Sequence, residues 1–393
     1  MTSRERPGVP PVRPPRARRE ELPFPTGAQL DLLRAALLPA QQAAPAWRRW
    51  KARGLQLESV DEASARMLSQ LWTNRDAASI DAGDSTLLKG IYRHALARNA
   101  VTLENALEAT DVLVSAGIPV LFIKGAAMIA INSGRVGARP IADADILIPE
   151  TDAERAVALL MAAGYDAKPG YGMAPPAGLM HAWACKSPKG SELDVHWWAF
   201  KTAGDDTSMF ETAREATILG RPVLIPSVTE SLVHVVANAF VSPTGGSPLR
   251  WIADALLLLE IDGGTIDWDA LVVRTSRPGL TLRLASGLDF LAREFGAPVP
   301  ADVVTVLRRR RVSWQERGAY WAAVNDPRVG VRLLYQLEQH RARRLYYPTG
   351  VPRDFLGHLA QVAGPMTGKR RDFLKSRALG VWQRLAKGEP LLR

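Results

Sequence analysis

The chain has 393 residues, 47% of them hydrophobic and 23% charged, a composition typical of a folded protein with room for roughly two or three cores. Its single cysteine, Cys185, excludes an internal disulfide framework and any zinc site built from several cysteines. The N-terminus lacks the apolar segment of a signal peptide, and no apolar run approaches the roughly 18–20 residues that span a bilayer, so the sequence predicts a cytoplasmic protein.

The positive charge is concentrated near the C-terminus. Residues 301–393 hold 19 lysines and arginines against 7 aspartates and glutamates, a net charge of +12, whereas the other 300 residues hold 31 basic and 33 acidic side chains. Such a region either attracts nucleic acid, anionic lipid or an acidic partner, or is a solvated, arginine-rich helical surface. The charge distribution alone leaves both interpretations open.

The chain begins with an arm and a helical region. Residues 1–26 are rich in arginine and proline and are expected to be disordered or extended. Residues 27–117 have a helical pattern, clearest over Ser85–Ala116, where apolar side chains recur at helical spacing. Gly117 and Pro119 end this helix.

A small α/β unit is predicted over residues 118–226, and it begins with a strand that runs into a helix. Val120–Ile123 is an apolar run of strand length that stops at Lys124-Gly125, and a short helix is expected over Ala126–Asn132. Asp143–Ile148 is the second predicted strand.

A helix and a hairpin complete the α/β unit. We expect a helix over Asp152–Ala163, with Thr151 as its N-cap and Glu154 completing a capping box. A short edge strand is expected over Tyr165–Ala167. The predicted hairpin consists of His181–Lys186, the turn Ser187–Gly190 and Glu192–Trp198.

From about residue 227 the pattern is helical again, which predicts a helical domain over 227–311 and a basic helical region over 312–393. The sequence therefore predicts an α+β fold, in which a small mixed-sheet core is flanked by N-terminal helices and a C-terminal helical domain. The helices expected in this domain are Thr229–Phe240, Leu249–Glu260, Trp268–Thr275 and Leu280–Glu294.

Carboxylates alternate with apolar residues on two of the predicted strands. Because side chains two positions apart share a face of a strand, Asp143 and Asp145 point to one side, and so do Glu192, Asp194 and His196. If the two strands are neighbours, three or four acidic oxygen donors converge on one spot. Hard oxygen ligands of this kind suit Mg²⁺ or Mn²⁺ bound together with a phosphorylated substrate.

The same motifs, taken in order, resemble a known family. They are Leu121–Ala127, Arg139, Asp143-x-Asp145, Gly164-Tyr165, Glu192–Trp197, Leu232–His234, Arg250-x-x-x-Asp254 and Ile266–Trp268. Over roughly residues 85–300 the chain resembles the bacterial nucleotidyltransferase family usually labelled uncharacterised, part of the polymerase-β-like nucleotidyltransferase superfamily.

The resemblance implies an enzyme built on a mixed-sheet nucleotidyltransferase core. Such an enzyme transfers a nucleoside monophosphate from a nucleoside triphosphate (NTP), such as ATP, to a hydroxyl, phosphate or amine acceptor and releases pyrophosphate. The resemblance implies that Asp143 and Asp145 hold the divalent cations. It also implies that Asp194 ligates the metal that activates the acceptor, and that Asp194 could take part in deprotonating it.

The resemblance further implies a nucleotide-binding role for Lys124, Gly125 and Arg139. Gly125 would let the backbone approach the phosphates closely, and Lys124 would offset the triphosphate charge. The superfamily commonly has Gly-Ser or Gly-Gly at this turn, so the serine hydroxyl is absent here. Arg139 either clamps phosphate or pairs with Asp143 or Asp145 and orients them.

Four further features have alternative interpretations. Glu192 is either an outer residue of the metal site or solvent-exposed. His196 either donates a hydrogen bond to a carboxylate or phosphate without contacting the metal itself, or is a packed, hydrogen-bonded histidine. Arg250 and Asp254, four residues apart, either form a plain intrahelical ion pair that stabilises the fold or have a catalytic role, and their place in the family pattern favours the stabilising role. The basic, amphipathic segment 372–386 either contacts a membrane surface or docks on its own protein.

The sequence therefore predicts a metal-dependent nucleotidyltransferase with Mg²⁺ or Mn²⁺, an NTP and an unidentified small-molecule, glycan or peptide acceptor. One alternative is a non-catalytic nucleotide-binding or partner-binding module on the same fold. Another is an enzyme that modifies RNA or tRNA, which the basic C-terminal region suggests. Because the rest of the chain is nearly neutral, we expect a small acceptor rather than nucleic acid.

Overall fold

The computed structural model describes residues 22–132, 135–167, 180–202, 204–240, 249–325, 329–347 and 351–363. Most of the predicted arm over 1–26 lies outside these ranges, and so does the whole of segment 372–386. Among the described residues, no helix combines the length and the apolar composition that crossing a membrane requires.

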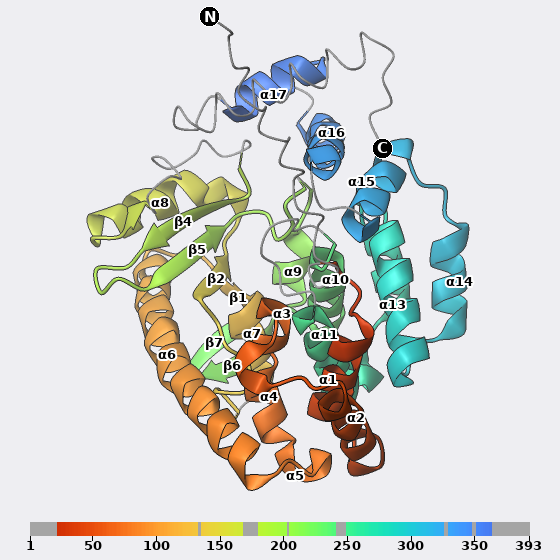
Figure 1. The fold of residues 1–393 in the computed structure, drawn as a ribbon. Coiled ribbons are helices and arrows are strands. Elements are labelled where there is room, and N and C mark those ends of the chain that lie inside the picture. Colours follow the sequence, from red (N-terminus) through yellow and green to blue (C-terminus); the bar gives the residue numbers. More distant parts are fainter. Residues whose placement is uncertain are drawn as a thin grey trace, which may run out of the picture.

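A mixed sheet forms the centre of the structure (Figure 1). In the described residues its seven strands are ordered β3-β4-β5-β2-β1-β7-β6. The pairs β2–β5 and β1–β7 are parallel, and the remaining neighbours are antiparallel. The strands are β1 (Leu121–Ile123), β2 (Asp143–Leu147), β3 (Asp166–Ala167), β4 (Ala182–Lys186), β5 (Glu192–His196), β6 (Arg214–Ile218) and β7 (Arg221–Ile225).

Helices precede the sheet in sequence, and the first of them, α1, contacts α13 of the C-terminal half through Arg34 and Glu294. The longest is the 34-residue α6 (Ala82–Ser115), close to the predicted bounds, and Figure 1 shows it passing along the sheet. It ends in a Schellman motif, in which Gly117 has φ 77° and the amide of Ile118 donates to the carbonyl of Leu113 over 3.0 Å. The others are α1 (Gly27–Leu37), α2 (Ala40–Ala52), α3 (Glu62–Ala65), α4 (Leu68–Thr73) and α5 (Arg75–Ala78).

The remaining helices lie within the α/β unit or follow it, so helices flank the mixed-sheet core as predicted. Helices α10, α11 and α13 pack together on the side of the sheet opposite α6 (Figure 1). These helices are α7 (Lys124–Ile131), α8 (Ala153–Ala162), α9 (Thr207–Glu211), α10 (Val228–Asn238), α11 (Arg250–Asp262), α12 (Trp268–Arg274), α13 (Thr281–Phe295), α14 (Ala301–Arg309), α15 (Trp314–Asn325), α16 (Val329–Tyr346) and α17 (Phe355–Ala363).

Two local predictions differ from the structure. Helix α7 begins at Lys124, two residues earlier than expected, directly after β1. The capping box of Thr151 and Glu154 is wrong. Glu150–Asp152 forms a short 3₁₀ turn, so Asp152 becomes the N-cap of α8, without a side-chain hydrogen bond.

The hairpin β6–β7 was not predicted from the sequence. Its two turn residues, Leu219 and Gly220, have φ values of 50° and 80°. Two consecutive residues with positive φ suit a two-residue hairpin turn, where Asn-Gly or Asp-Gly is the usual signal. Leucine is uncommon at such a position, so this turn has no recognisable signal in the sequence.

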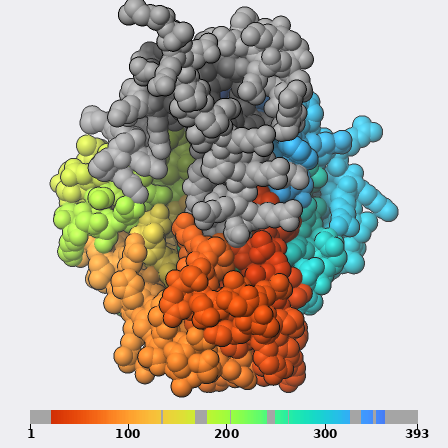
Figure 2. All heavy atoms as spheres, viewed as in Figure 1, coloured from red at the N-terminus to blue at the C-terminus, as the bar shows by residue number. Residues whose placement is uncertain are grey.

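The core surrounds the acid-free face of the central strands. Ala144 and Ile146 of β2 are completely buried, and Trp197 and Trp198, just after β5, are 3% and 2% exposed. Figure 2 shows the N-terminal helices, in red and orange, over the lower part of one face of the molecule. Sheet residues lie on one flank of that face, and the helices in cyan lie on the other.

Candidate active site

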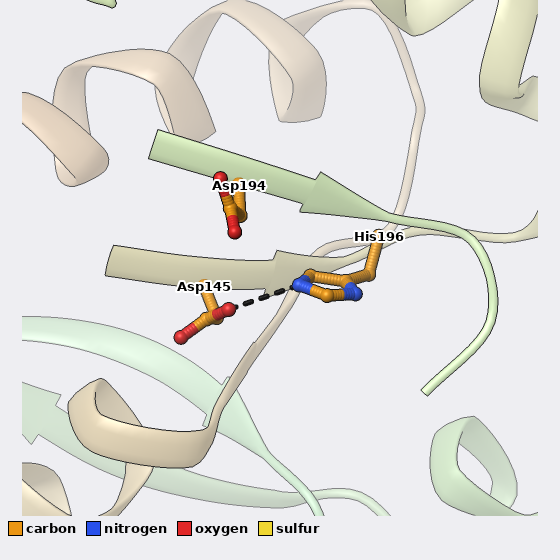
Figure 3. A group of neighbouring side chains, drawn as sticks. All are labelled: Asp145, Asp194 and His196. Carbon is orange, nitrogen blue, oxygen red and sulfur yellow. Dashed lines mark hydrogen bonds and ion pairs between the residues drawn. The ribbon is translucent and has the colours of Figure 1, made fainter. Parts of the chain in front are cut away.

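The parallel pairing of β2 and β5 brings the predicted acidic residues together. The register sets Asp145 opposite Asp194 and Asp143 opposite Glu192. One ligand atom each from Asp145, Asp194 and His196 lies within 4.8 Å of the other two. Figure 3 shows the carboxylate of Asp194 directed toward β2 and the ring of His196 beside Asp145. Two strands that are far apart in sequence thus present a cluster of donors on one face of the sheet.

Asp143 and Glu192 lie one step farther along the same strands. Both side chains are half-buried, and within the described residues neither belongs to the group of converging ligand atoms. Burial and the neighbouring Asp145 raise the pKa of Asp143 above its usual value. The structure therefore concentrates charge at Asp145, and the metal-binding role of Asp143 stays a prediction.

Lys124 reaches the acidic cluster from the end of β1. The antiparallel register pairs Ile123 with Asp145, so the next residue, Lys124, is beside that carboxylate. Its Nζ donates to Oδ1 of Asp145 over 2.5 Å and lies 3.1 Å from Nε2 of His196. Nε2 of His196 is in turn 2.9 Å from Oδ1 of Asp145. The three groups form a closed triangle.

The charges of this triangle are mutually stabilised. Burial alone would raise the pKa of Asp145, but Lys124 and His196 outweigh burial and hold that pKa well below its usual value. For Lys124, burial lowers the pKa. The carboxylates of Asp145, Asp194 and Asp143 more than compensate, so the pKa of Lys124 is raised above its usual value. Burial and Lys124 lower the pKa of His196. Near neutral pH the site therefore holds an ionised Asp145, a protonated Lys124 and a neutral His196.

Gly125 is required for the packing of α7. A Cβ atom at this position would lie 2.5 Å from Nη1 of Arg139 and 2.6 Å from Cγ2 of Ile141. No real Cβ tolerates such distances, so the missing side chain lets the start of α7 lie against the segment that leads into β2. A nucleotide-binding role for Gly125 stays a prediction beside this packing role.

Arg139 forms its ion pair with α11. Its Nε and Nη2 donate to the two carboxylate oxygens of Asp254 over 2.7 and 2.8 Å. Two expectations are thereby corrected: Arg139 does not use this fork for Asp143 or Asp145, and Asp254 pairs with Arg139 rather than with Arg250. The reason is that α11 lies beside the segment before β2, where Arg250 donates to the carbonyl of Pro140 over 3.2 Å.

The donor set fits a divalent cation. Two carboxylates, one of them kept ionised, supply hard oxygen ligands, and a neutral imidazole supplies nitrogen. The ring of His196 is held beside the carboxylates by the contacts of its Nε2 with Asp145 and Lys124. Asp145, Asp194 and His196 are the residues that would hold the ion.

Comparison with protein families decides the class of this chain. A family model described as an uncharacterised nucleotidyltransferase matches residues 64–296, which cover both acidic strands and the turn between β1 and α7. The chain belongs to this nucleotidyltransferase family. It is accordingly a transferase. A search of curated proteins finds no match.

Solved nucleotidyltransferases resemble the chain only distantly. A crystal structure of ANT(2″)-Ia in complex with adenylyl-2″-tobramycin is 20% identical, with a TM-score of 0.33, and covers 45% of this chain and 98% of that one. An antigenic nucleotidyltransferase-like protein from Paracoccidioides brasiliensis is 17% identical, with a TM-score of 0.33, and covers 59% and 96%. Likenesses at this level bear on neither acceptor nor mechanism.

Two residues position the segment that leads into β2 of this nucleotidyltransferase, and one of them, Asn99, was not found from the sequence. Asn99 of α6 donates to the carbonyls of Val136 and Arg139 over 2.6 and 2.8 Å and accepts from the amide of Ile141 over 3.0 Å. Asp254 holds Arg139 from the other side. Asn99 belongs to no local pattern that signals a site, because it acts on a segment remote in sequence. Asp254 lies in the Arg250-x-x-x-Asp254 motif, but its pairing with Arg139 was not predicted.

Two further basic side chains lie near the acidic cluster. The ring of His181 is 5.4 Å from that of His196, and burial together with His196 places the pKa of His181 well below its usual value. Lys201 follows β5, and burial and the nearby Lys124 lower its pKa, although Asp194 and Asp145 oppose the change. The cluster therefore sits in a setting that is rich in nitrogen donors.

Proposed function

We propose that this protein is a metal-dependent enzyme of the polymerase-β-like superfamily that transfers a nucleoside monophosphate from an NTP to an acceptor and releases pyrophosphate. The observation that carries the proposal is the convergence of Asp145 and Asp194, on adjacent parallel strands, beside the turn at Lys124. Membership of the nucleotidyltransferase family supports it.

The acidic residues would hold Mg²⁺ or Mn²⁺. Asp145 and Asp194 are the main ligands in this proposal, and Asp143 joins them from the next position on the same face of β2. Divalent cations at such a site polarise the phosphoryl group and stabilise the attacking and leaving oxygens. Asp194 would also receive the proton of the acceptor, because it is the half-buried member of the pair.

The start of α7 would receive the triphosphate. Its first amides and its positive dipole end favour an anion, and Lys124 adds a full positive charge. Arg139 would contribute through Nη1, which lies against Gly125, while its other nitrogens remain on Asp254. His196 would hold the ion together with the two aspartates, and Glu192 would support the ligands without reacting.

The acceptor proposed is a small molecule, glycan or peptide of the cytoplasm. Outside residues 301–393 the chain has nearly balanced charges, which does not favour a polyanionic acceptor at the core. Nucleic acid ranks below these acceptors. Electrostatic binding of nucleic acid must weaken as the salt concentration rises. A gel-shift assay in which binding did not weaken with salt would therefore exclude a nucleic-acid acceptor.

The test is transfer of label from α-phosphate-labelled NTPs in the presence of Mg²⁺ or Mn²⁺, with a crude extract as the source of acceptor. We expect a labelled product with the native protein and its loss in Asp145→Asn and Asp194→Asn. Glu215→Gln, an exposed carboxylate on β6 of the same sheet, is the matched control and should label normally. Labelling that persisted in both aspartate variants would overturn the proposal.

A non-catalytic nucleotide-binding module is the second candidate, and one observation favours it. The ammonium of Lys124 already neutralises Asp145, the residue on which metal binding would depend. Calorimetry distinguishes the two candidates. NTP binding that is indifferent to divalent cations, with no turnover, would support the binding module over the enzyme.

A further inference from the structure

Lys124 occupies a position that a metal ion would also require. Its Nζ is 2.5 Å from Oδ1 of Asp145 and 3.1 Å from Nε2 of His196, and these two residues belong to the three whose ligand atoms converge. An ammonium group and a divalent cation seek the same partners, since both are positively charged and both bind carboxylate oxygen. The Lys124 side chain therefore affects how strongly the site binds a metal ion.

The two cations compete for the same carboxylate. A carboxylate oxygen binds Mg²⁺ at about 2.1 Å. An ion on Oδ1 of Asp145 would then be no more than about 4.6 Å from Nζ at its present place, because Nζ is 2.5 Å from the same oxygen. Repulsion between charges this close is strong where the carboxylate, only 6% exposed, is shielded from water. Lys124 in its present place therefore weakens binding of an ion to this oxygen.

The backbone at Lys124 is held in an unusual conformation. Its φ of 50° lies in the left-handed region, which costs free energy for a residue with a side chain. The neighbours on either side are constrained: Ile123 is completely buried in β1, and Gly125 packs against Arg139 and Ile141. The strained backbone conformation of Lys124 is thus part of the arrangement that directs its side chain toward Asp145.

We propose that Lys124 is an internal counter-ion that blocks the metal site until a triphosphate gives it another anionic partner. The inference rests on the proposed function and adds a coupling to it. The start of α7, where the triphosphate would lie, begins at Lys124 itself, so the side chain needs only to rotate from Asp145 to a phosphate. Nucleotide and metal then bind cooperatively, and each tightens the other by the same factor.

The experiment measures Mn²⁺ binding by electron paramagnetic resonance and calorimetry, with and without an ATP analogue whose α–β bridge is methylene. For the native protein we expect weak Mn²⁺ binding alone and binding tighter by about ten-fold or more with the analogue. Lys124→Met should bind Mn²⁺ more tightly without nucleotide and lose most of the coupling. Lys124→Arg, which keeps the charge, should behave like the native protein.

A matched control and a stability measurement accompany the variants. Lys51 pairs with Asp84 over 2.9 Å away from the acidic cluster, so Lys51→Met removes a similar ion pair and should leave Mn²⁺ affinity unchanged. Melting in EDTA should show Lys124→Met below the native protein, because Asp145 has lost its counter-charge. Mn²⁺ should raise its melting temperature more than that of the native protein.

Each outcome decides the question. If Mn²⁺ binds in an Asp145-dependent manner but equally well to the native protein and Lys124→Met, the counter-ion role is wrong and the proposed function stands. If neither protein binds Mn²⁺ even with the analogue, both ideas fail. If Lys124→Met does not fold, the native protein still decides, because binding of Mn²⁺ that the analogue does not strengthen contradicts the coupling.

Discussion

Two buried histidines show how surroundings set the chemistry of a single residue. His196 touches a lysine and an aspartate, whereas His234 of α10 bonds through Nε2 to the carbonyl of Ala199 over 2.8 Å. Burial, assisted by the positive charge of Lys124, lowers the pKa of His234 to about 3. His234 is thus a neutral donor that fixes the segment after β5.

A pH dependence of stability follows from His234. Between its usual pKa of 6.5 and about 3, the unfolded chain binds a proton at this residue and the folded chain does not. Acidification through this range therefore lowers the free energy of unfolding, by about 2 kcal/mol at pH 5. We expect His234→Gln to lose that part of the difference between urea unfolding at pH 7.5 and at pH 5.

The control for this prediction is His94→Gln, which changes an exposed histidine of α6. It should keep the pH dependence of the native protein. An unchanged difference between the two pH values in His234→Gln would show that this histidine is not the group responsible.

At the scale of elements, the segment before β2 is held between two helices. Asn99 of α6 binds its backbone, and Asp254 of α11 binds the side chain of Arg139. Both Asp254 and Arg139 are largely shielded from water, with side chains 9% and 19% exposed. The position of Asp143 and Asp145 therefore depends on elements that precede and follow the sheet.

The Arg139–Asp254 pair should behave as a buried ion pair. Arg139→Met or Asp254→Leu leaves one charge without its partner and is expected to lower the free energy of unfolding by about 3–5 kcal/mol. The double variant should cost clearly less than the sum, because no charge is left unpaired. Urea unfolding of the four proteins measures this coupling.

An exposed pair serves for comparison. Glu62 and Arg66 lie four residues apart, and the side chain of Glu62 is 79% exposed. Removing that pair should cost about 1 kcal/mol or less, because water screens it. Additive effects at Arg139 and Asp254 would mean that the two charges do not depend on each other.

Local sequence patterns predicted the elements that carry the chemistry. The alternation of Asp143 with Asp145 and of Glu192 with Asp194 placed these side chains on the correct faces, and the long α6 and the hairpin of β4 and β5 were also predicted. The contacts of Asn99 and Asp254 were not, because they join residues 42 and 115 positions apart. Such pairings are set by packing, which no local pattern encodes.

At the scale of the whole molecule, Tyr347 connects the C-terminal helices to the sheet. Its hydroxyl donates to the carboxylate of Glu150, just after β2, and accepts from Nε1 of Trp198 over 3.0 Å. The rings of Trp198 and Tyr347 are 5.8 Å apart. A residue that follows α16 thus contacts the segments that leave both acidic strands.

Tyr347→Phe should therefore destabilise the protein. The change leaves the buried Nε1 of Trp198 and the carboxylate of Glu150 without this partner, at a cost of about 1–3 kcal/mol. Urea unfolding measures the loss. Tyr346→Phe, at the neighbouring and more exposed tyrosine, is the control and should change little. Equal stability of the two variants would contradict a structural role for the Tyr347 hydroxyl.

The parallel pairing of β2 with β5 has a consequence for folding fidelity. A slip of one residue between these strands would turn Asp194 and His196 from the open face into the aliphatic layer around Ala144 and Ile146. A carboxylate there would have no partner, and its desolvation would make the misaligned sheet unstable. The charged groups of the site thereby also select the correct register of the two strands. A chain with the wrong register at this pair would be unstable, and would not accumulate as a folded but inactive protein.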